Sequence, residues 1–369
     1  NDDPFAPVCK ACRERIATDG DDTAIVWLTP DQRYGEKLAT PDITIADLIG
    51  EVDPIKVAEG RYLSDELTIH YGLVPRTHRG VFAINELPDL AERIQVGLLN
   101  VMEERDVQIR GYKIRLPLDV FVVATANPED YTNRGRIITP LKDRLGSEVR
   151  THYPRTVEEE IAIMEAEARP FDIEGIEVVY PEFMKRVIAE LTHTARRSSD
   201  VSQRSGVSVR VSITNYENVM SNAVRRAIRL KERVAVPRVS DLTAVVASTA
   251  GKIELDTVGE VKEEKIVEKL TRQAVNAVFR SYFDVSDFDQ LLAGFDKGLS
   301  VNVSEMSPAM EYVNQLSRVG GLKPAVNKLH GTGSPQMVAA AVEFILEGLH
   351  LNKRLNKDDL EGKARYSPR

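Results

Sequence analysis

The sequence lacks several features that would assign it to a specialised class of protein. No apolar run reaches the roughly 18 residues that a membrane-spanning helix needs. Positive charge is not gathered into a stripe, because the 49 Lys and Arg residues are mixed with 57 Asp and Glu residues along the chain. We therefore expect no membrane binding and no DNA binding. A soluble cytoplasmic protein with two or three globular domains fits the 369 residues.

Cysteine is also scarce, since the chain has only two, Cys9 and Cys12. Their Cys-Lys-Ala-Cys order is half of a zinc site or a redox pair, but no second pair and no Cys-His grouping completes a set of four ligands. We favour two helix-borne thiols in a reducing cytosol and keep metal or redox use as the alternative.

The pattern of apolar residues divides the chain into three parts. Residues 1–155 mix strand-like runs with helical patterns and turn residues, which is typical of an α/β layer. Residues 156–255 carry apolar residues at helical spacing, and we predict a helical domain there. Residues 256–369 continue in the same way, as a helical C-terminal extension.

Two apolar runs in the first part end on polar residues. The run VFAINELPDL (81–90) stops at Asn85 and Glu86, and a helix pattern with a predicted capping box at Asp89 and Glu92 follows. The run DVFVVATANP (119–128) ends at Asn127. We interpret both runs as parallel strands buried on both faces, and we predict a hairpin at 107–116 between them. Glu86 and Asn127 are then expected at one edge of a sheet.

A carboxylate and an amide at such an edge suit the activation of a water for attack on a phosphate. Glu86 would deprotonate or orient the water, and Asn127 would hold it in line. The alternative is structural: Glu86 caps the next helix and Asn127 makes a turn with Pro128.

Three basic features have two interpretations each. Arg144, in TPLKDRLG, is placed to stabilise phosphate charge in a neighbouring subunit or to pair with Asp143 or Glu148 on the surface. Arg210 lies at the head of a helix predicted to start near Ser212, with the same two readings. The stretch 225–233, RRAIRLKER, is interpreted as a solvated helix face rather than a nucleic-acid patch.

Together these motifs resemble an AAA+ ATPase of the magnesium-chelatase I-subunit and MoxR-like group, over roughly residues 40–250. The segment around FAINEL resembles the Walker B strand, which implies Glu86 as the catalytic glutamate and Asn85 at the position of the Walker B aspartate. ATANP resembles the first sensor, Asn127. LKDRLG resembles the arginine-finger segment with Arg144, and Ser208-Val209-Arg210 resembles the second sensor, which implies that Arg210 contacts the γ-phosphate.

The sequence departs from this pattern at two places. Asn85 is an amide where the pattern has an aspartate, so it offers Mg²⁺ only a weak, water-mediated contact. No Gly-x-x-x-x-Gly-Lys-Ser/Thr occurs in the chain, so the Walker A phosphate loop is missing. We expect that loop upstream of residue 1 in a longer protein. The expected fold is therefore an incomplete AAA+ nucleotide-binding α/β domain, then a helical lid, then a further helical segment.

The resemblance implies a motor that hydrolyses ATP with Mg²⁺, bound by Asn85 and Glu86, and that remodels a partner protein. It implies a ring of identical subunits, a hexamer, and a partner with a von Willebrand A domain. One alternative is a nucleotide-dead scaffold that serves as an interaction module. Another is a bacterial enhancer-binding transcription activator, against which stands the absence of the GAFTGA loop.

Overall fold

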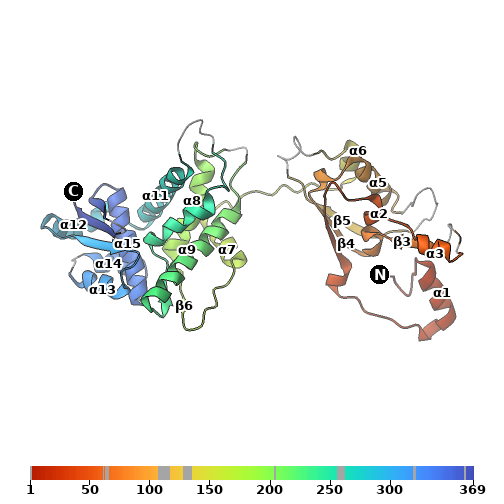
Figure 1. The fold of residues 1–369 in the computed structure, drawn as a ribbon, viewed down its shortest axis with the longest axis horizontal. Helices are drawn as coiled ribbons and strands as arrows, with labels where there is room; N and C mark the ends of the chain where they lie inside the picture. The colour runs from red at the N-terminus through yellow and green to blue at the C-terminus, as the bar shows by residue number, and fades with distance from the viewer. Residues whose placement is uncertain are drawn as a thin grey trace. The chain divides into compact units, whose positions relative to one another are not determined.

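The computed structural model divides the chain into two compact units, Asn1–Arg150 and Thr151–Arg369, each considered by itself below (Figure 1). It describes residues 2–369 except 61, 63–65, 107–116, 128–134, 203–204, 256–261, 319–320 and 361–362. The predicted hairpin at 107–116 therefore lies outside the described residues. No described helix is both long enough and apolar enough to cross a membrane.

The first unit is a mixed α/β unit built around a small parallel sheet. Its helices and strands are, in chain order, α1 (Lys10–Asp19), β1 (Tyr34–Leu38), α2 (Ile45–Leu48), β2 (Gly50–Val52), α3 (Pro54–Ala58), β3 (Ile69–Tyr71), α4 (Leu73–Arg76), β4 (Gly80–Asn85), α5 (Glu92–Glu103), β5 (Val120–Ala124) and α6 (Thr139–Arg144). The sheet has the order β1-β4-β5, with both pairings parallel, and a separate antiparallel pair joins β2 to β3. The predicted α/β class is confirmed.

The sheet is covered on one face only by the described residues. Phe82 and Ile84 of β4 are buried and pack with Leu90, Ile94 and Leu98, three residues of α5 and the turn before it. The opposite face carries exposed apolar side chains. They are Tyr34, Leu38, Val81, Phe121 and Val123. The prediction that both strands are buried on both faces is wrong, because no described element packs on this second face.

The start of α5 also differs from the prediction. The helix begins at Glu92 after Ala91, and no side chain caps it, while Asp89 ends a short 3₁₀ turn, Leu87–Asp89. The predicted capping box is therefore absent. The turn tightens the chain around Pro88, and this moves the helix start past the residue whose side chain was expected to cap it.

The second unit is mostly helical and has one extended hydrophobic core from Ile161 to Tyr366. Its helices and strands are α7 (Val157–Glu167), β6 (Glu177–Val178), α8 (Glu182–Arg197), α9 (Val209–Leu230), β7 (Val234–Ala235), α10 (Val245–Thr249), α11 (Glu263–Tyr282), α12 (Asp289–Asp296), β8 (Val301–Ser304), α13 (Ala309–Arg318), α14 (Leu322–Lys328), α15 (Pro335–Leu351), β9 (Leu355–Leu360) and β10 (Lys363–Pro368). The proposed boundary near residue 255 stays a prediction, since elements on both sides of it share this core.

Helical spacing explains most of these elements. In α8, Phe183, Val187, Leu191 and Ala195 recur at intervals of four residues and are buried, so one face of the helix enters the core. Helix α9 starts at Val209, earlier than predicted, because Ser208 caps it: its Oγ accepts the N–H of Arg210 at 3.2 Å.

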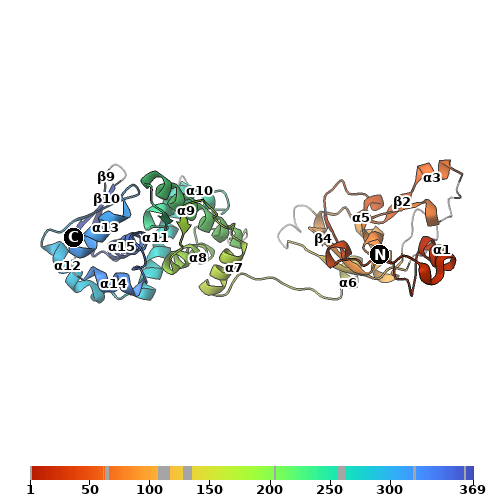
Figure 2. The ribbon, with the colours of Figure 1, turned by 90° about the horizontal axis from the view of Figure 1, so that it is seen from below.

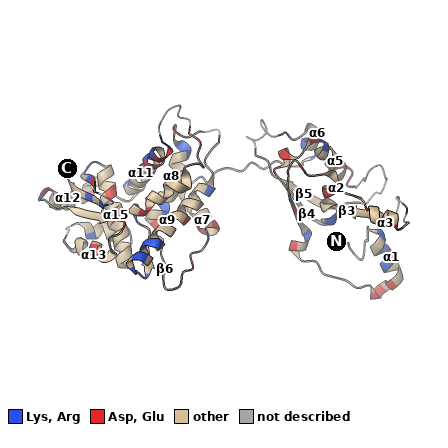
Figure 3. Cartoon of the chain, viewed as in Figure 1, with Lys and Arg blue, Asp and Glu red and all other residues tan. Residues whose placement is uncertain are grey.

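The C-terminal extension is not entirely helical, which corrects one part of the prediction. Strands β8, β10 and β9 form an antiparallel sheet in that order, and β9 packs against α15 (Figures 1 and 2). The strand β9 follows α15 after only three residues, and its charged sequence, Leu-Asn-Lys-Asp-Asp-Leu, lacks the clean alternation that predicts a strand. Lys, Arg, Asp and Glu are interspersed over the described ribbons of both units (Figure 3).

Candidate functional site

The carboxyl end of β4, the middle strand of the parallel sheet, carries the two predicted Walker B positions. Asn85 is the last residue of the strand, and Glu86 follows with a left-handed backbone, φ 57° and ψ 48°. Both side chains are half-buried. The N–H of Glu86 donates to Thr125 Oγ1 at 3.1 Å, and the N–H of Leu87 donates to the Thr125 carbonyl at 2.9 Å. The loop that carries Glu86 is therefore fixed to the end of β5.

The Asn85 amide links all three strands of the sheet. Its Nδ2 donates to Oε1 of Glu36 on β1, and Thr125 Oγ1 donates to its Oδ1 at 3.3 Å. Glu36 and Thr125 were not predicted as site residues. Glu36 lies 49 residues before Asn85 in the chain, so only the pairing of β1 with β4 brings its carboxylate here. The amide at position 85 thus has a carboxylate beside it.

Asn127 lies three residues after the end of β5, and its side chain is exposed. Because β4 and β5 are adjacent and parallel, their carboxyl ends meet at one edge of the sheet. The structure therefore has Glu86 and Asn127 in loops that follow neighbouring strands, as the sequence predicts. The water-positioning role of Asn127 stays a prediction.

Arg144 ends the short helix α6, and its guanidinium is engaged within its own chain. It forms an ion pair with Glu103, the last residue of α5, with Nε 2.8 Å from Glu103 Oε2. Its Nη1 also donates to the Pro140 carbonyl at 2.7 Å. The surface-pair alternative named Asp143 or Glu148, so the partner differs from both. The sequence gives no signal for this pair, because α5 and α6 meet only in the folded unit.

Arg210 belongs to the second unit, in the first turn of the 22-residue helix α9. Its side chain is exposed, and its N–H donates to Ser208 Oγ. The γ-phosphate contact implied by the resemblance stays a prediction.

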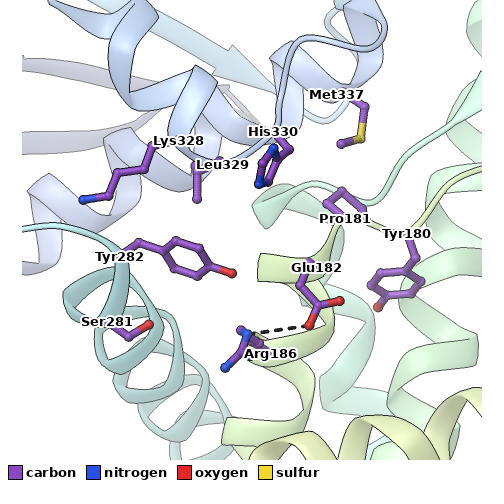
Figure 4. A pocket seen from close by; sticks show the side chains of 10 residues that line it. All are labelled: Tyr180, Pro181, Glu182, Arg186, Ser281, Tyr282, Lys328, Leu329, His330 and Met337. Atoms are coloured by element: carbon purple, nitrogen blue, oxygen red, sulfur yellow. Dashed lines mark ion pairs between the residues drawn. The ribbon is translucent and has the colours of Figure 1, made fainter.

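A cleft of about 480 Å³ in the second unit contains none of the predicted site residues. It lies between the N-terminus of α8, the C-termini of α11 and α14, and the start of α15 (Figure 4). Within it, Arg186 pairs with Glu182 at 3.6 Å and with Glu158 at 2.9 Å, so its charge is already matched. The remaining lining is mostly apolar. It has no group placed for the predicted chemistry.

Comparison with known proteins assigns the class of the first unit. Residues 59–147 match the family model described as the Sigma-54 interaction domain, an AAA+ domain, and this segment contains β4, α5, β5 and α6. The chain is therefore an AAA+ protein over this segment. The recognition made from the motifs is confirmed at the level of that class.

Solved structures of ATPases also align with the chain, with low TM-scores. A candidate ATPase of Cytophaga hutchinsonii is 19% identical with a TM-score of 0.28, over 65% of this chain and 76% of that one. NtrX of Brucella abortus is 16% identical with a TM-score of 0.38, over 67% of this chain and 52% of that one. The BchI and BchD complex of magnesium chelatase is 17% identical with a TM-score of 0.29, over 64% and 73%. We draw no functional argument from these alignments.

Proposed function

We propose that this chain provides the water-activating part of an AAA+ ATPase, with Glu86 as the general base. The observation that supports this best is the fixed position of Glu86. Its carboxylate follows the middle strand of a parallel sheet, in a loop that Thr125 holds through two hydrogen bonds. Ligands of open parallel sheets bind at this edge. A half-buried carboxylate there is within the means of a protein to accept a proton from water.

The residues at this edge fit the magnesium side of a nucleotide site. Mg²⁺ prefers oxygen ligands and keeps several waters, and Glu36, Asn85 and Glu86 all offer oxygen atoms. Glu36 provides the negative charge that the amide of Asn85 lacks, because the two side chains are hydrogen-bonded. When bound, Mg²⁺ would neutralise charge on the ATP phosphates. The phosphate cradle itself has no counterpart in these residues, since no Gly-Lys loop occurs in the sequence.

The remaining predicted residues would act on charge and orientation. The Asn127 amide would hold the water in line with the phosphate, and Arg144 would stabilise the charge that develops during transfer. Arg144 would have to leave Glu103 to do so, which is consistent with a finger that acts in a neighbouring subunit of a ring. Arg210 would contact the γ-phosphate. Ring assembly as a hexamer, a partner with a von Willebrand A domain, and remodelling of that partner belong to this proposal and rest on the motif resemblance.

Two other functions have one observation each in their favour. A nucleotide-dead scaffold is favoured by the missing phosphate loop and by the pairing of Arg144 with Glu103. A transcription activator is favoured by the description of the matched Sigma-54 interaction domain. The sequence has no GAFTGA segment, so we do not propose the activator.

ATP hydrolysis by the 369-residue chain with Mg²⁺ tests the proposal. We expect Glu86→Gln to lower kcat by about 10²- to 10⁴-fold, because the amide cannot accept the proton. The matched control is Glu92→Gln, since Glu92 is a nearby exposed carboxylate on α5, 3.6 Å from Arg136. Its hydrolysis should equal that of the unchanged chain.

Two results would contradict the proposal in different ways. Equal hydrolysis by the Glu86→Gln variant removes Glu86 from the mechanism. No Mg²⁺-dependent hydrolysis by the unchanged chain favours the scaffold instead.

A further inference from the structure

The first 38 residues of the chain are ordered without a hydrophobic core of their own. None of residues 2–38 is buried, and Phe5 and Trp27 are 94% and 90% exposed. The 10-residue helix α1 buries no side chain at all. A helix this short is marginal in water unless tertiary contacts hold it. Something other than apolar burial has to fix α1 in place.

Three potential metal ligands meet at the start of that helix. Asp2, Cys9 and Cys12 are all partly buried, and one ligand atom from each lies within 4.8 Å of the other two. Tetrahedral zinc with Zn–S bonds of about 2.3 Å separates its sulfur ligands by roughly 3.8 Å, so small side-chain movements would close the site. Both cysteines are free thiols.

Local hydrogen bonds hold the three groups in this arrangement. The Asp2 carboxylate accepts the N–H groups of Val8 and Cys9, both at 3.0 Å, so the loop 2–9 folds back on itself. Cys9 is the N-cap of α1, and its Sγ accepts the N–H of Cys12 at 3.3 Å. An N–H···S bond of this kind orients both sulfur atoms of a Cys-x-x-Cys pair to the same side. The chelating geometry is therefore set before any ion binds.

Charge balance favours a dication here. Two thiolates and one carboxylate carry three negative charges, and Arg79 provides one positive charge, with Nη1 3.8 Å from Asp2 Oδ1. Arg79 also donates to the Ala6 carbonyl at 3.1 Å, so it belongs to the same small cluster. A divalent ion would complete neutrality. Sulfur ligands select Zn²⁺ over Mg²⁺ and Ca²⁺, which prefer oxygen.

We propose that Asp2, Cys9 and Cys12 form a Zn²⁺ site that fastens α1 and the N-terminal loop to the first unit. A fourth position, beyond these three ligands, would take water or another donor. Burial and the neighbouring Cys9 and Asp2 raise the pKa of Cys12 to about 11, so metal binding has to displace a proton from this thiol. Zinc affinity should accordingly increase with pH.

The test is metal binding by the reduced 369-residue chain, with Co²⁺ as a spectroscopic probe and Zn²⁺ as the competitor. The chain has only two cysteines, so any thiolate-to-cobalt charge-transfer band reports Cys9 and Cys12 directly. We expect one Co²⁺ per chain with this band, and displacement by Zn²⁺. Cys12→Ser should abolish the band, and Asp2→Asn should weaken Co²⁺ binding by at least about tenfold.

Asp3→Asn is the matched control. Asp3 is the adjacent carboxylate and lies 3.7 Å from Arg79, but it is not in the cluster, so its change should leave the band intact. Binding without a thiolate band, or equal loss with Asp3→Asn and Asp2→Asn, would overturn the proposal. So would a reduced chain that binds neither ion while its two thiols readily form a disulfide, which would indicate a redox pair.

A second measurement keeps the proposal testable if a variant fails to fold. In the unchanged chain, Zn²⁺ should slow amide hydrogen exchange across residues 9–19 and protect both thiols from alkylation. A chelator should reverse both effects. Zinc that binds without changing either would not be fastening α1.

Discussion

In the first unit one face of the parallel sheet carries exposed apolar side chains, whereas in the second unit helix α15 is buried along its whole middle. Phe121 on β5 is 69% exposed. By contrast, every residue from Val338 to Leu349 on α15 is buried. Parallel sheets normally have both faces covered, so the first unit has less burial to stabilise it than its number of strands implies. Stability and candidate chemistry are thus concentrated in different units.

The same contrast extends to polar groups. The second unit buries charges in its core: Glu343 on α15 accepts from the Tyr312 hydroxyl at 2.7 Å and from the Ser240 N–H at 3.0 Å. Buried charges persist only where partners satisfy them, so these contacts specify one packing arrangement. In the first unit the comparable carboxylates, Glu36 and Glu86, face solvent at least in part. That exposure leaves them available for chemistry.

The largest expected effect is at the buried ion pair of α9. Arg226 pairs with Asp241, and both side chains are almost fully inaccessible. Arg226→Met should lower the free energy of unfolding of the second unit by about 3–5 kcal/mol, because Asp241 would keep a buried charge without its partner. Hydrogen exchange resolved by peptide would assign the loss to residues 151–369.

The neighbouring Arg225 provides the control for this pair. Its side chain is 58% exposed and pairs with Glu305 at 3.6 Å, so Arg225→Met should cost no more than about 1 kcal/mol. Equal losses for both arginines would mean that the core pair contributes nothing special.

An intermediate effect is expected where α15 meets α11. A Cβ at Gly348 would lie 2.0 Å from the Phe279 ring, so Gly348→Ala should destabilise the second unit by about 1–3 kcal/mol despite the better helix propensity of alanine. In α12, Gly294 has only Leu299 near, at 3.9 Å, so Gly294→Ala should be neutral or stabilising. Thermal unfolding measures both, and a stabilised Gly348→Ala chain would mean that the two helices separate easily.

The smallest effect is expected on the uncovered sheet face. Phe121→Thr should change the free energy of unfolding by less than about 0.5 kcal/mol, because the side chain is mostly in solvent already. Phe82, on the next strand and the opposite face, is fully buried, and Phe82→Ala should cost about 3–5 kcal/mol. Chemical denaturation compares the two. A large loss with Phe121→Thr would show that this face is covered in solution.

Helices with a clear apolar period were predictable from the sequence. The helix predicted at 335–351 corresponds to α15 as observed, and α7, α8, α11 and α13 begin and end within about three residues of their predicted bounds. The strands β4 and β5 were also predicted, together with the polar residues that end them. Periodicity is a local property, so a single segment contains all the information needed.

Contacts between distant segments were not predictable. The sequence placed RRAIRLKER on a solvated face, but Arg226 is buried, because the loop after β7 brings Asp241 and the Val236 carbonyl to its guanidinium. Glu36 reaches Asn85 only through strand pairing. Glu103 reaches Arg144 only because α5 and α6 are in contact. None of these partners is marked by spacing along the chain.

By itself, the sequence determined the mixed α/β class of the first unit, the helical character of the second, and the residues that resemble an AAA+ site. Each follows from short-range patterns, since a helix or a strand end is specified by its own few residues. Only the tertiary structure decided which face of the sheet is covered, that a carboxylate accompanies Asn85, and that Asp2 joins Cys9 and Cys12. These depend on which segments meet in space, and that is set by packing and strand pairing rather than by any one segment.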